Sequence, residues 1–411
     1  MRWANFFHIY QPPHWPRAII QKVARESYRP LIQFLLAHEH IRITLNISGS
    51  LTEQLTAGSQ HQDIIKGIRT LLRRGQIEVV DSAMYHAILP LLPEHEIVRQ
   101  VRLNHSTNRR AFGALYHPRG FFPPEMAYGP RLGTILSRLG YSWIVLDGIS
   151  HPGYVDYTRK YTIKNTNLTA VFRNRYISDY LAFEIKLSQT NRFLDTVQRW
   201  NNQRDVLITA MDGENLGHHR HAAKRVWQRL VHEPHVETVT ISELLQLLPG
   251  PDRVSVRSAS WSSTSADMKM GVPFALWKHP KNSLHRLQWE LFGTVFALVQ
   301  ERRKKGSLPS SLQKQFDQTS SSDWFWWASR EPWWDIDIVV AAAQRLRLLG
   351  DQLNDNPNIA ERMRALVDRI TDTAERWNRL GIAQRHAVRF LKKENSPRYL
   401  GGKSVTYRHD L

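Results

Sequence analysis

The stretch VLITAMDGEN at residues 206–215 decides how this chain folds, because it joins a buried strand to an acidic turn. The run from Val206 to Met211 is largely apolar, which indicates a short buried strand. Asp212 stands where that strand stops. In a parallel α/β barrel the carboxyl ends of the strands meet at one rim, where catalytic groups lie. The stretch therefore predicts a barrel strand that brings a carboxylate to the rim.

A second acid follows another apolar run. Residues 120–128 read GFFPPEMAY, and Glu125 comes directly after the run and two prolines. Two carboxylates that meet at a barrel rim, in a chain with 14 tryptophans, are typical of glycosidic-bond chemistry. The plainer interpretations are that Asp212 caps a helix and that Glu125 is an acid in a surface turn.

Further apolar runs recur at intervals that suit alternating strands and helices. These five runs lie at residues 3–9, 41–47, 77–80, 142–146 and 168–172, and with the two runs above they give seven candidate strands. Helix-like segments lie between them, for example at residues 28–37, 62–73 and 130–139. Seven strands in this alternation favour a closed or nearly closed parallel barrel over an open sheet, although spacing alone leaves closure open.

The pattern changes after residue 250, and we predict three regions. They are a catalytic barrel over residues 1–250, a linking segment rich in Ser and Thr over residues 251–275, and a helical domain over residues 276–411. Within the last region apolar residues recur three and four apart, which indicates amphipathic helices. We expect the helical domain to complete the active-site cleft.

The composition excludes several classes of protein. The chain has no cysteine, which excludes disulfides and thiolate chemistry, and no apolar stretch long enough to span a bilayer. The N-terminus runs directly into a candidate strand without a signal peptide, so we expect a cytoplasmic protein. The net charge of +19 raises nucleic-acid binding as a hypothesis, but no nucleic-acid motif accompanies it. A solvated basic surface is the favoured interpretation, and the oligomeric state is left open.

Neutral polar side chains follow two other predicted strands. His8 and Gln11 come at the end of the first run, where two prolines stop the strand. Tyr85 and His86 follow the third run in the same way. Histidine and glutamine both donate and accept hydrogen bonds, as sugar hydroxyls require.

Histidines gather just after Asp212, at His218, His219 and His221. A zinc site is one interpretation, since histidines and carboxylates ligate zinc. The spacing is not that of usual metal ligands, so we expect one of them, His218, to line the sugar site instead.

Tryptophans are concentrated after the predicted barrel. Aromatic faces stack on the C–H-rich faces of sugars, so exposed tryptophans near a cleft favour glycan binding. The candidates for substrate contact are Trp261, and Trp324 and Trp326 beside Asp323. A place in the hydrophobic core is the plainer interpretation.

Taken together and in this order, these segments resemble glycoside hydrolase family 57. The matching residues are His8, Gln11 and Pro12; Tyr85 and His86; Pro124 and Glu125; Asp212 and Glu214; residues 172–174 with 178–179; and residues 322–327. The two prolines before Glu125 depart from the usual pattern of the family and affect the shape of the loop.

The resemblance implies a (β/α)7 barrel, an incomplete TIM barrel, followed by a helical bundle. It also implies a retaining double displacement on α-1,4-glucans or maltooligosaccharides, with no metal or cofactor. Glu125 would be the nucleophile and Asp212 the general acid/base, about 5–6 Å apart as retaining enzymes require. Glu214 is the rival acid, because positions 212 and 214 share a face of a strand.

Several activities remain open at this point. An amylase-like hydrolase, a 4-α-glucanotransferase and an α-1,6 branching or debranching enzyme all fit the resemblance. A polysaccharide deacetylase has a related barrel but needs an Asp-Asp pair and a metal set that the strand ends do not show. A non-catalytic glycan-binding protein is the candidate from another class.

Overall fold

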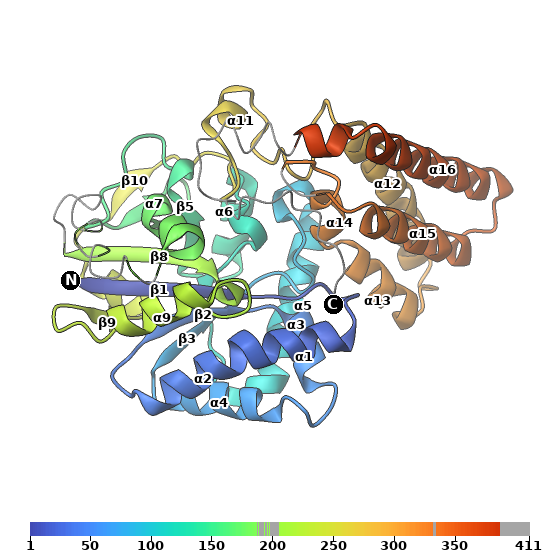
Figure 1. Cartoon of the computed structure of the whole chain (residues 1–411). Helices are drawn as coiled ribbons and strands as arrows, with labels where there is room; N and C mark the ends of the chain where they lie inside the picture. Colours follow the sequence, from blue (N-terminus) through green and yellow to red (C-terminus); the bar gives the residue numbers. More distant parts are fainter. Residues whose placement is uncertain are drawn as a thin grey trace. The chain divides into compact units, whose positions relative to one another are not determined.

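The computed structural model describes residues 1–186, 188, 193, 195, 197, 205–331 and 334–386. The chain divides into two compact units, Met1–Trp261 and Ser262–Leu411 (Figure 1). The boundary between them falls inside the stretch that the sequence assigned to a linking segment. Each unit is described below by itself.

The first unit contains, among its described residues, seven strands of a parallel barrel, at the positions that the apolar runs predicted. They are β1 (Arg2–Ile9), β2 (Ile43–Ile47), β3 (Ile77–Val80), β4 (Gly120–Phe121), β5 (Trp143–Asp147), β7 (Thr169–Arg173) and β8 (Val206–Asp212). One sheet has the order β3-β2-β1-β8, and the other joins β7, β5 and β4. Three short strands add to these sheets: β9 (Glu237–Val239) pairs with β1, β6 (Tyr161–Ile163) pairs with β7, and β10 (Asp252–Val254) pairs with β6.

Backbone hydrogen bonds join the two sheets at both seams. Between β3 and β4 the Asp81 amide donates to the Gly120 carbonyl at 3.1 Å, and the Phe122 amide donates to the Asp81 carbonyl at 2.9 Å. Between β7 and β8 the Asn174 amide donates to the Ile208 carbonyl at 2.7 Å. The sheets therefore close into a (β/α)7 barrel, which confirms the predicted fold class.

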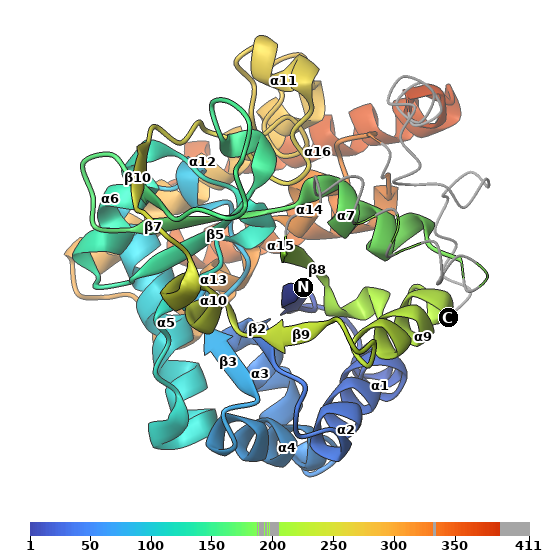
Figure 2. The same cartoon turned by 90° about the vertical axis from the view of Figure 1, so that its left-hand side faces the viewer.

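Helices lie around the outside of the ring of strands (Figure 2). They are α1 (Arg17–Val23), α2 (Arg29–Ala37), α3 (Gly49–Thr56), α4 (Gln62–Arg73), α5 (Glu94–Phe112), α6 (Pro130–Arg138), α7 (Arg175–Asp179), α9 (His221–Leu230) and α10 (Ile241–Leu247). Single helical turns stand at or near many strand ends: η1 (Ala24–Tyr28), η2 (Leu89–Leu91), η3 (Gly113–Leu115), η4 (Pro124–Met126), η5 (Gly148–Ser150), η6 (Tyr180–Glu184) and η8 (Gly213–Asn215).

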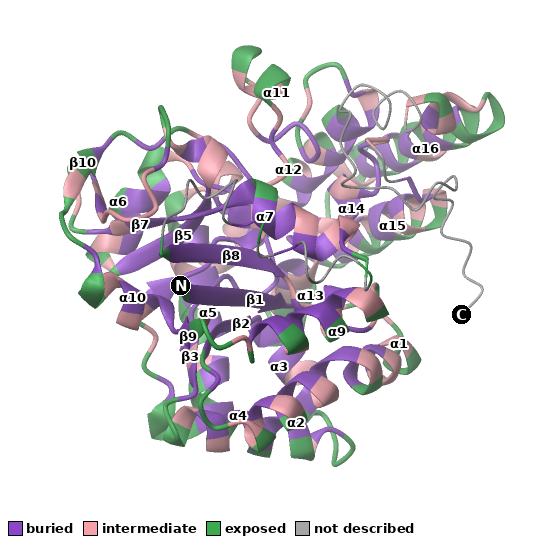
Figure 3. Ribbon diagram, turned by 60° about the vertical axis from the view of Figure 1, so that its left-hand side comes forward, coloured by how far each residue is buried: buried purple, intermediate pink, exposed green. Residues whose placement is uncertain are grey.

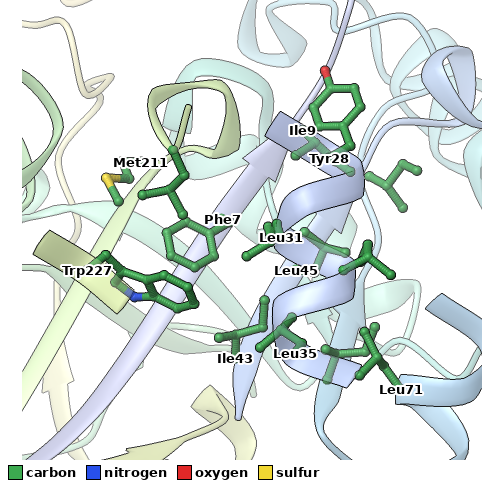
Figure 4. Packing of buried hydrophobic residues seen from close by; sticks show 14 of the residues in the cluster. Phe7, Ile9, Tyr28, Leu31, Leu35, Ile43, Leu45, Leu71, Met211 and Trp227 are labelled. Carbon is green, nitrogen blue, oxygen red and sulfur yellow. The ribbon is translucent and has the colours of Figure 1, made fainter. Parts of the chain in front are cut away.

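The main hydrophobic core lies between the strands and these helices. Phe7 and Leu45 on the strands meet Leu31 and Leu35 of α2, and the Phe7 ring meets Trp227 of α9 edge to face at 5.3 Å (Figure 4). Burial of each such side chain stabilises the fold by about 1.5–3 kcal/mol. β1 is buried along nearly its whole length, as a barrel strand must be (Figure 3).

The second unit is helical, as the amphipathic pattern predicted. Its helices are α11 (Ser265–Lys269), α12 (Ser283–Lys304), α13 (Ser310–Thr319), α14 (Asp323–Trp326), α15 (Ile336–Leu353) and α16 (Pro357–Arg379). Among the described residues of both units, no helix is long and apolar enough to cross a bilayer.

Candidate active site

The strand register brings two of the predicted residues side by side. His8, near the end of β1, lies opposite Asp212 at the end of β8, and opposite Asn46 of β2 on its other side. Because parallel strands end at one rim, a polar residue at each strand end faces the same space. The local cause is the sequence itself, since the prolines after His8 and the glycine after Asp212 stop the two strands.

Glu125 sits in a strained turn after β4. Its backbone is left-handed, with φ 60° and ψ 18°, and that of Met126 is left-handed too, with φ 48°. Non-glycine residues in this region cost about 1–3 kcal/mol and persist where the surroundings hold them. Trp261 supplies that hold, because its amide donates to the Glu125 carbonyl at 3.1 Å and its indole Nε1 donates to Glu125 Oε2 at 2.6 Å. Trp261 thus holds both the backbone and the side-chain carboxylate of Glu125.

Asp212 has a strongly raised pKa. Burial raises the pKa of its carboxyl well above the usual value, and the charges of Glu214 and Glu125 raise it further, whereas Arg173 lowers it. The residue is partly exposed, and the described part of the chain forms no hydrogen bond to its carboxyl group. The Asp212 carboxyl therefore keeps its proton to a higher pH than an ordinary aspartate does.

Glu214, the rival acid, is bound to the protein instead. Its Oε1 accepts hydrogen bonds from the Tyr10 amide at 3.1 Å, from Gln11 Nε2 at 3.2 Å and from the Tyr28 hydroxyl. Burial raises the pKa of Glu214, and these donors oppose the shift. Gln11 also donates to the Tyr28 hydroxyl at 3.0 Å. Gln11 and Glu214, both predicted to bind substrate, thus hold each other, and Glu214 acts on Asp212 through its charge.

The two predicted histidines form a hydrogen-bonded pair. His8 Nε2 lies 3.0 Å from His86 Nε2, and His8 Nδ1 lies 2.8 Å from Asn46 Oδ1. Burial lowers the pKa of His8 to about 4 and that of His86 well below 6.5, so both rings are neutral near pH 7. His86 Nδ1 lies 3.9 Å from Glu125 Oε1. Sequence reasoning missed Asn46, because a buried strand asparagine looks like any other core residue until its partners are known.

A buried ion cluster behind Trp261 was also missed as part of the site. Arg173 binds Asp147 at 2.7 Å, Asp179 at 3.1 Å and the Ala210 carbonyl at 2.9 Å. Its guanidinium carbon lies 5.5 Å from the centre of the Trp261 ring. The available signal was that residues 172–174 and 178–179 belong to one of the matched segments.

Two other predicted residues have partners elsewhere. Tyr85 is buried, and its amide donates to Gln100 Oε1 at 3.2 Å. His218 Nδ1 lies 2.6 Å from Glu26 Oε2. The contribution of Tyr85 and His218 to a sugar site stays a prediction. Within the described ranges, no group of three or more histidines and acids is arranged to hold a metal ion.

The predicted contacts from the second unit centre on α14. Ser321 Oγ donates to Asp323 Oδ2 at 2.7 Å at the start of this one-turn helix. Trp324 is buried, with 4% of its surface exposed, whereas Trp326 is partly exposed. Burial of Trp324 fits a structural role better than stacking on a ligand. The predicted position of Asp323 and Trp326 over the barrel rim stays a prediction.

The sequence model of the family described as "Glycosyl hydrolase family 57" matches residues 4–257. The α-amylase of Pyrococcus horikoshii is 29% identical over 140 residues, which are 34% of this chain and 21% of that protein. The 4-alpha-glucanotransferase of Thermococcus kodakarensis is 25% identical over 151 residues, 36% of this chain and 22% of that protein. The matched stretch thus spans about a fifth of the length of these curated relatives.

Solved structures share the fold. A GH57 branching enzyme from Thermococcus kodakaraensis, solved with glucose, superposes with a TM-score of 0.67 and 18% identity over 97% of this chain and 96% of that one. The 4-alpha-glucanotransferase from Thermococcus litoralis superposes with a TM-score of 0.64 and 16% identity over 85% of this chain and 60% of that one. At these identities the likeness establishes the architecture.

Proposed function

Because the chain belongs to glycosyl hydrolase family 57, we propose that it acts on α-1,4-glucans as a retaining hydrolase or transglycosylase. The observation that carries the proposal is the pairing of two unlike carboxyl groups. Glu125 is held by the Trp261 indole, and Asp212 has a raised pKa that depends in part on the charge of Glu125. One carboxylate is fixed for attack and the other is kept protonated, as double displacement requires.

In the first step Glu125 attacks the anomeric carbon, and the bond from that carbon to the glycosidic oxygen breaks. Asp212 gives its proton to the departing oxygen, so the products are a glycosyl ester of Glu125 and a shortened glucan. The ester carries no charge. The Coulombic contribution of Glu125 to the pKa of Asp212 therefore disappears and that pKa falls, so Asp212 stays ionised after it has given up its proton and is available as a base.

In the second step Asp212 takes a proton from water or from a sugar hydroxyl, whose oxygen attacks the ester and restores Glu125. Water as acceptor gives hydrolysis, and a glucan hydroxyl gives transfer. An amylase-like hydrolase is the main proposal, and 4-α-glucanotransferase, α-1,6 branching and α-1,6 debranching activities are its competitors. The absence of cysteine supports a cytoplasmic location, because a reducing compartment does not call for disulfides.

The deciding experiment is product profiling with maltoheptaose and with amylopectin, with and without a chelator. Shortened chains favour a hydrolase, and redistributed chain lengths favour a 4-α-glucanotransferase. New α-1,6 branches favour a branching enzyme, and lost α-1,6 branches favour a debranching enzyme. Binding without any product would favour a non-catalytic glycan-binding protein. Acetate release that stops with chelator, from an acetylated glycan, would favour a deacetylase.

The Glu125→Gln variant tests whether Glu125 is the nucleophile. We expect this variant to lose turnover while it keeps its fold and its affinity for maltoheptaose, because only the nucleophile changes. Activity of Glu125→Gln close to that of the unchanged protein would contradict the proposed mechanism.

A further inference from the structure

Asn46 is fully buried near the end of β2, and both the nitrogen and the oxygen of its side-chain amide have hydrogen-bond partners. Its Nδ2 donates to the Val80 carbonyl at 3.3 Å, and its Oδ1 lies 2.8 Å from His8 Nδ1. A carbonyl oxygen only accepts, so the bond to Val80 fixes which way the amide points. The Asn46 oxygen therefore faces His8, and His8 carries its proton on Nδ1.

This assignment determines the protonation of the second histidine. A neutral imidazole carries one proton, so His8 Nε2 is an acceptor once Nδ1 holds the proton. The hydrogen bond of 3.0 Å between the two Nε2 atoms then requires His86 to donate. A neutral His86 that is protonated on Nε2 has a lone pair on Nδ1, the atom that lies 3.9 Å from Glu125 Oε1.

We propose that Asn46 is a positioning residue, which acts through His8 and His86 to place a hydrogen-bond acceptor rather than an N–H donor beside Glu125. The inference rests on the proposed function and deepens it. His86 Nδ1 and a Glu125 oxygen are then neighbouring acceptors, and an O–H donor that lies within reach of both can give its proton to either. We assign that donor to the 2-hydroxyl of the sugar that Glu125 attacks, since hydrogen bonds to this hydroxyl strengthen in glycosidase transition states.

The opposite tautomer would weaken the nucleophile. If His86 carried its proton on Nδ1, an N–H group would face the Glu125 carboxylate and stabilise its charge in the ground state. The stabilisation would be lost during attack, so it would raise the barrier. The Asn46 amide excludes that arrangement, because a flipped pair would leave its oxygen facing a bare nitrogen.

Protonation of His8 would reverse the direction of the hydrogen bond between His8 and His86. An added proton on His8 Nε2 makes that atom a donor, so His86 must accept through Nε2 and carry its own proton on Nδ1. The groups that face the pair include Asn46 from β2, Glu125 from η4 and Asp212 from β8, with the uncharged rings of Tyr10, Phe122 and Trp261. Asn46→Asp would add a charge at one of these positions and favour protonated His8.

The first test compares three variants by the pH profile of kcat/KM. Asn46→Leu removes the acceptor, and we expect a loss of about tenfold or more, the order of one misdirected buried hydrogen bond. Asn46→Asp keeps an acceptor for His8 Nδ1, so it should retain more activity than Asn46→Leu at pH 8 and lose activity at a higher pH on the acid side. Asn5→Leu is the control, a buried β1 asparagine that binds Trp227 Nε1 and Trp3 O, and it should leave the acid limb unmoved.

The second test uses a substrate without the 2-hydroxyl on the attacked sugar, such as 2-deoxy-α-glucosyl fluoride. If the hydroxyl binds His86, Asn46→Leu should cost much less on this substrate than on α-glucosyl fluoride. Equal costs on the two substrates would overturn the assignment of the hydroxyl. An acid limb of Asn46→Asp that coincides with that of the unchanged protein would overturn the positioning role.

The third measurement separates this inference from the proposed function. Neutron diffraction of the unliganded protein near pH 7 should show deuterium on His8 Nδ1 and His86 Nε2. Deuterium on His86 Nδ1 would overturn the inference whatever the protein's activity. A protein with the expected deuterium positions that neither binds nor converts any α-glucan would instead overturn the proposed function.

Discussion

At the scale of single residues, the site separates two acids between which strand periodicity could not decide and of which the family resemblance favoured Asp212. Asp212 and Glu214 lie two positions apart, and strand periodicity alone allows either to face a substrate. The structure gives Glu214 three donors from Tyr10, Gln11 and Tyr28, whereas the carboxyl of Asp212 is left with charged neighbours. A general acid must reach the leaving oxygen, so Asp212 is the better candidate.

Substitution of each acid should give a different kinetic signature. Asp212→Asn is expected to lose far more activity on maltooligosaccharides than on α-glucosyl fluoride, because fluoride leaves without protonation. Glu214→Gln should also lose activity on α-glucosyl fluoride, because Glu214 holds Gln11. Its extra loss on maltooligosaccharides should be smaller than that of Asp212→Asn, because Glu214 acts on Asp212 only through its charge. Rates on the two substrates for both variants provide the check. Equal losses for Asp212→Asn would remove it from the role of acid.

The raised pKa of Asp212 also has a consequence for stability. A carboxyl whose pKa is higher in the folded than in the unfolded protein stabilises the fold below its unfolded pKa and loses that contribution as pH rises through its folded pKa. Asp212→Asn removes the ionisable group, so its Tm relative to that of the unchanged protein should increase between pH 4 and pH 8. In a folding unit of 150–250 residues, a size close to that of Met1–Trp261, each kcal/mol shifts Tm by about 2–4 °C. Calorimetry at both pH values measures the difference, and a constant difference would contradict the raised pKa.

At the scale of elements, the sequence predicted the barrel strands better than their contacts. Apolar runs marked β1, β2, β3, β5, β7 and β8 to within a residue or two because barrel strands are buried on both faces. The left-handed turn at Glu125 could not be predicted from the local sequence. Trp261, which holds it through hydrogen bonds, lies 136 residues away along the chain. The role of the Asn46 amide was missed for the same reason, because long-range partners leave no local pattern, whereas Arg173 lay in a matched segment whose contacts could not be predicted.

The one-turn helix α14 shows how an element can depend on its neighbour. A single turn leaves its last carbonyl groups without partners inside the helix. Three side chains of α12 or its N-cap bind carbonyls in and just after α14: Asn282 to Ala328 at 2.9 Å, His285 to Phe325 at 3.0 Å and Gln288 to Trp324 at 2.8 Å. Burial lowers the pKa of His285 to about 3, so this donor stays neutral.

Loss of one of these donors should loosen α14 locally. We expect Gln288→Met, which keeps the side-chain length and removes the amide donor, to speed amide hydrogen exchange in residues 323–328. Gln300→Met, a partly buried change on the same helix, is the control and should leave exchange in that segment unchanged. Exchange followed by mass spectrometry measures both variants. Unchanged exchange in Gln288→Met would show that packing alone holds the segment.

At the scale of the whole molecule, the net charge of +19 calls for a physical account. A chain with 56 basic and 37 acidic residues repels itself at low ionic strength, and this repulsion opposes the compact state. The repulsion is screened over a Debye length of about 10 Å at 0.1 M salt. We therefore expect Tm to rise between about 10 mM and about 200 mM sodium chloride. A Tm that stays flat or falls would mean that favourable ion pairs outweigh the net repulsion.

Trp261 limits where the chain can be cut to separate the barrel from the rest of the molecule. It is the last residue of the first unit, and it grips Glu125 through both its amide and its indole. Ser262, its covalent neighbour, begins the second unit. Trp261 is thus both a hydrogen-bond partner of Glu125 and the residue at which the first unit ends. The barrel is therefore a poor candidate for transplantation by itself, since a splice at residue 257, where the family match ends, would carry Glu125 away without its anchor.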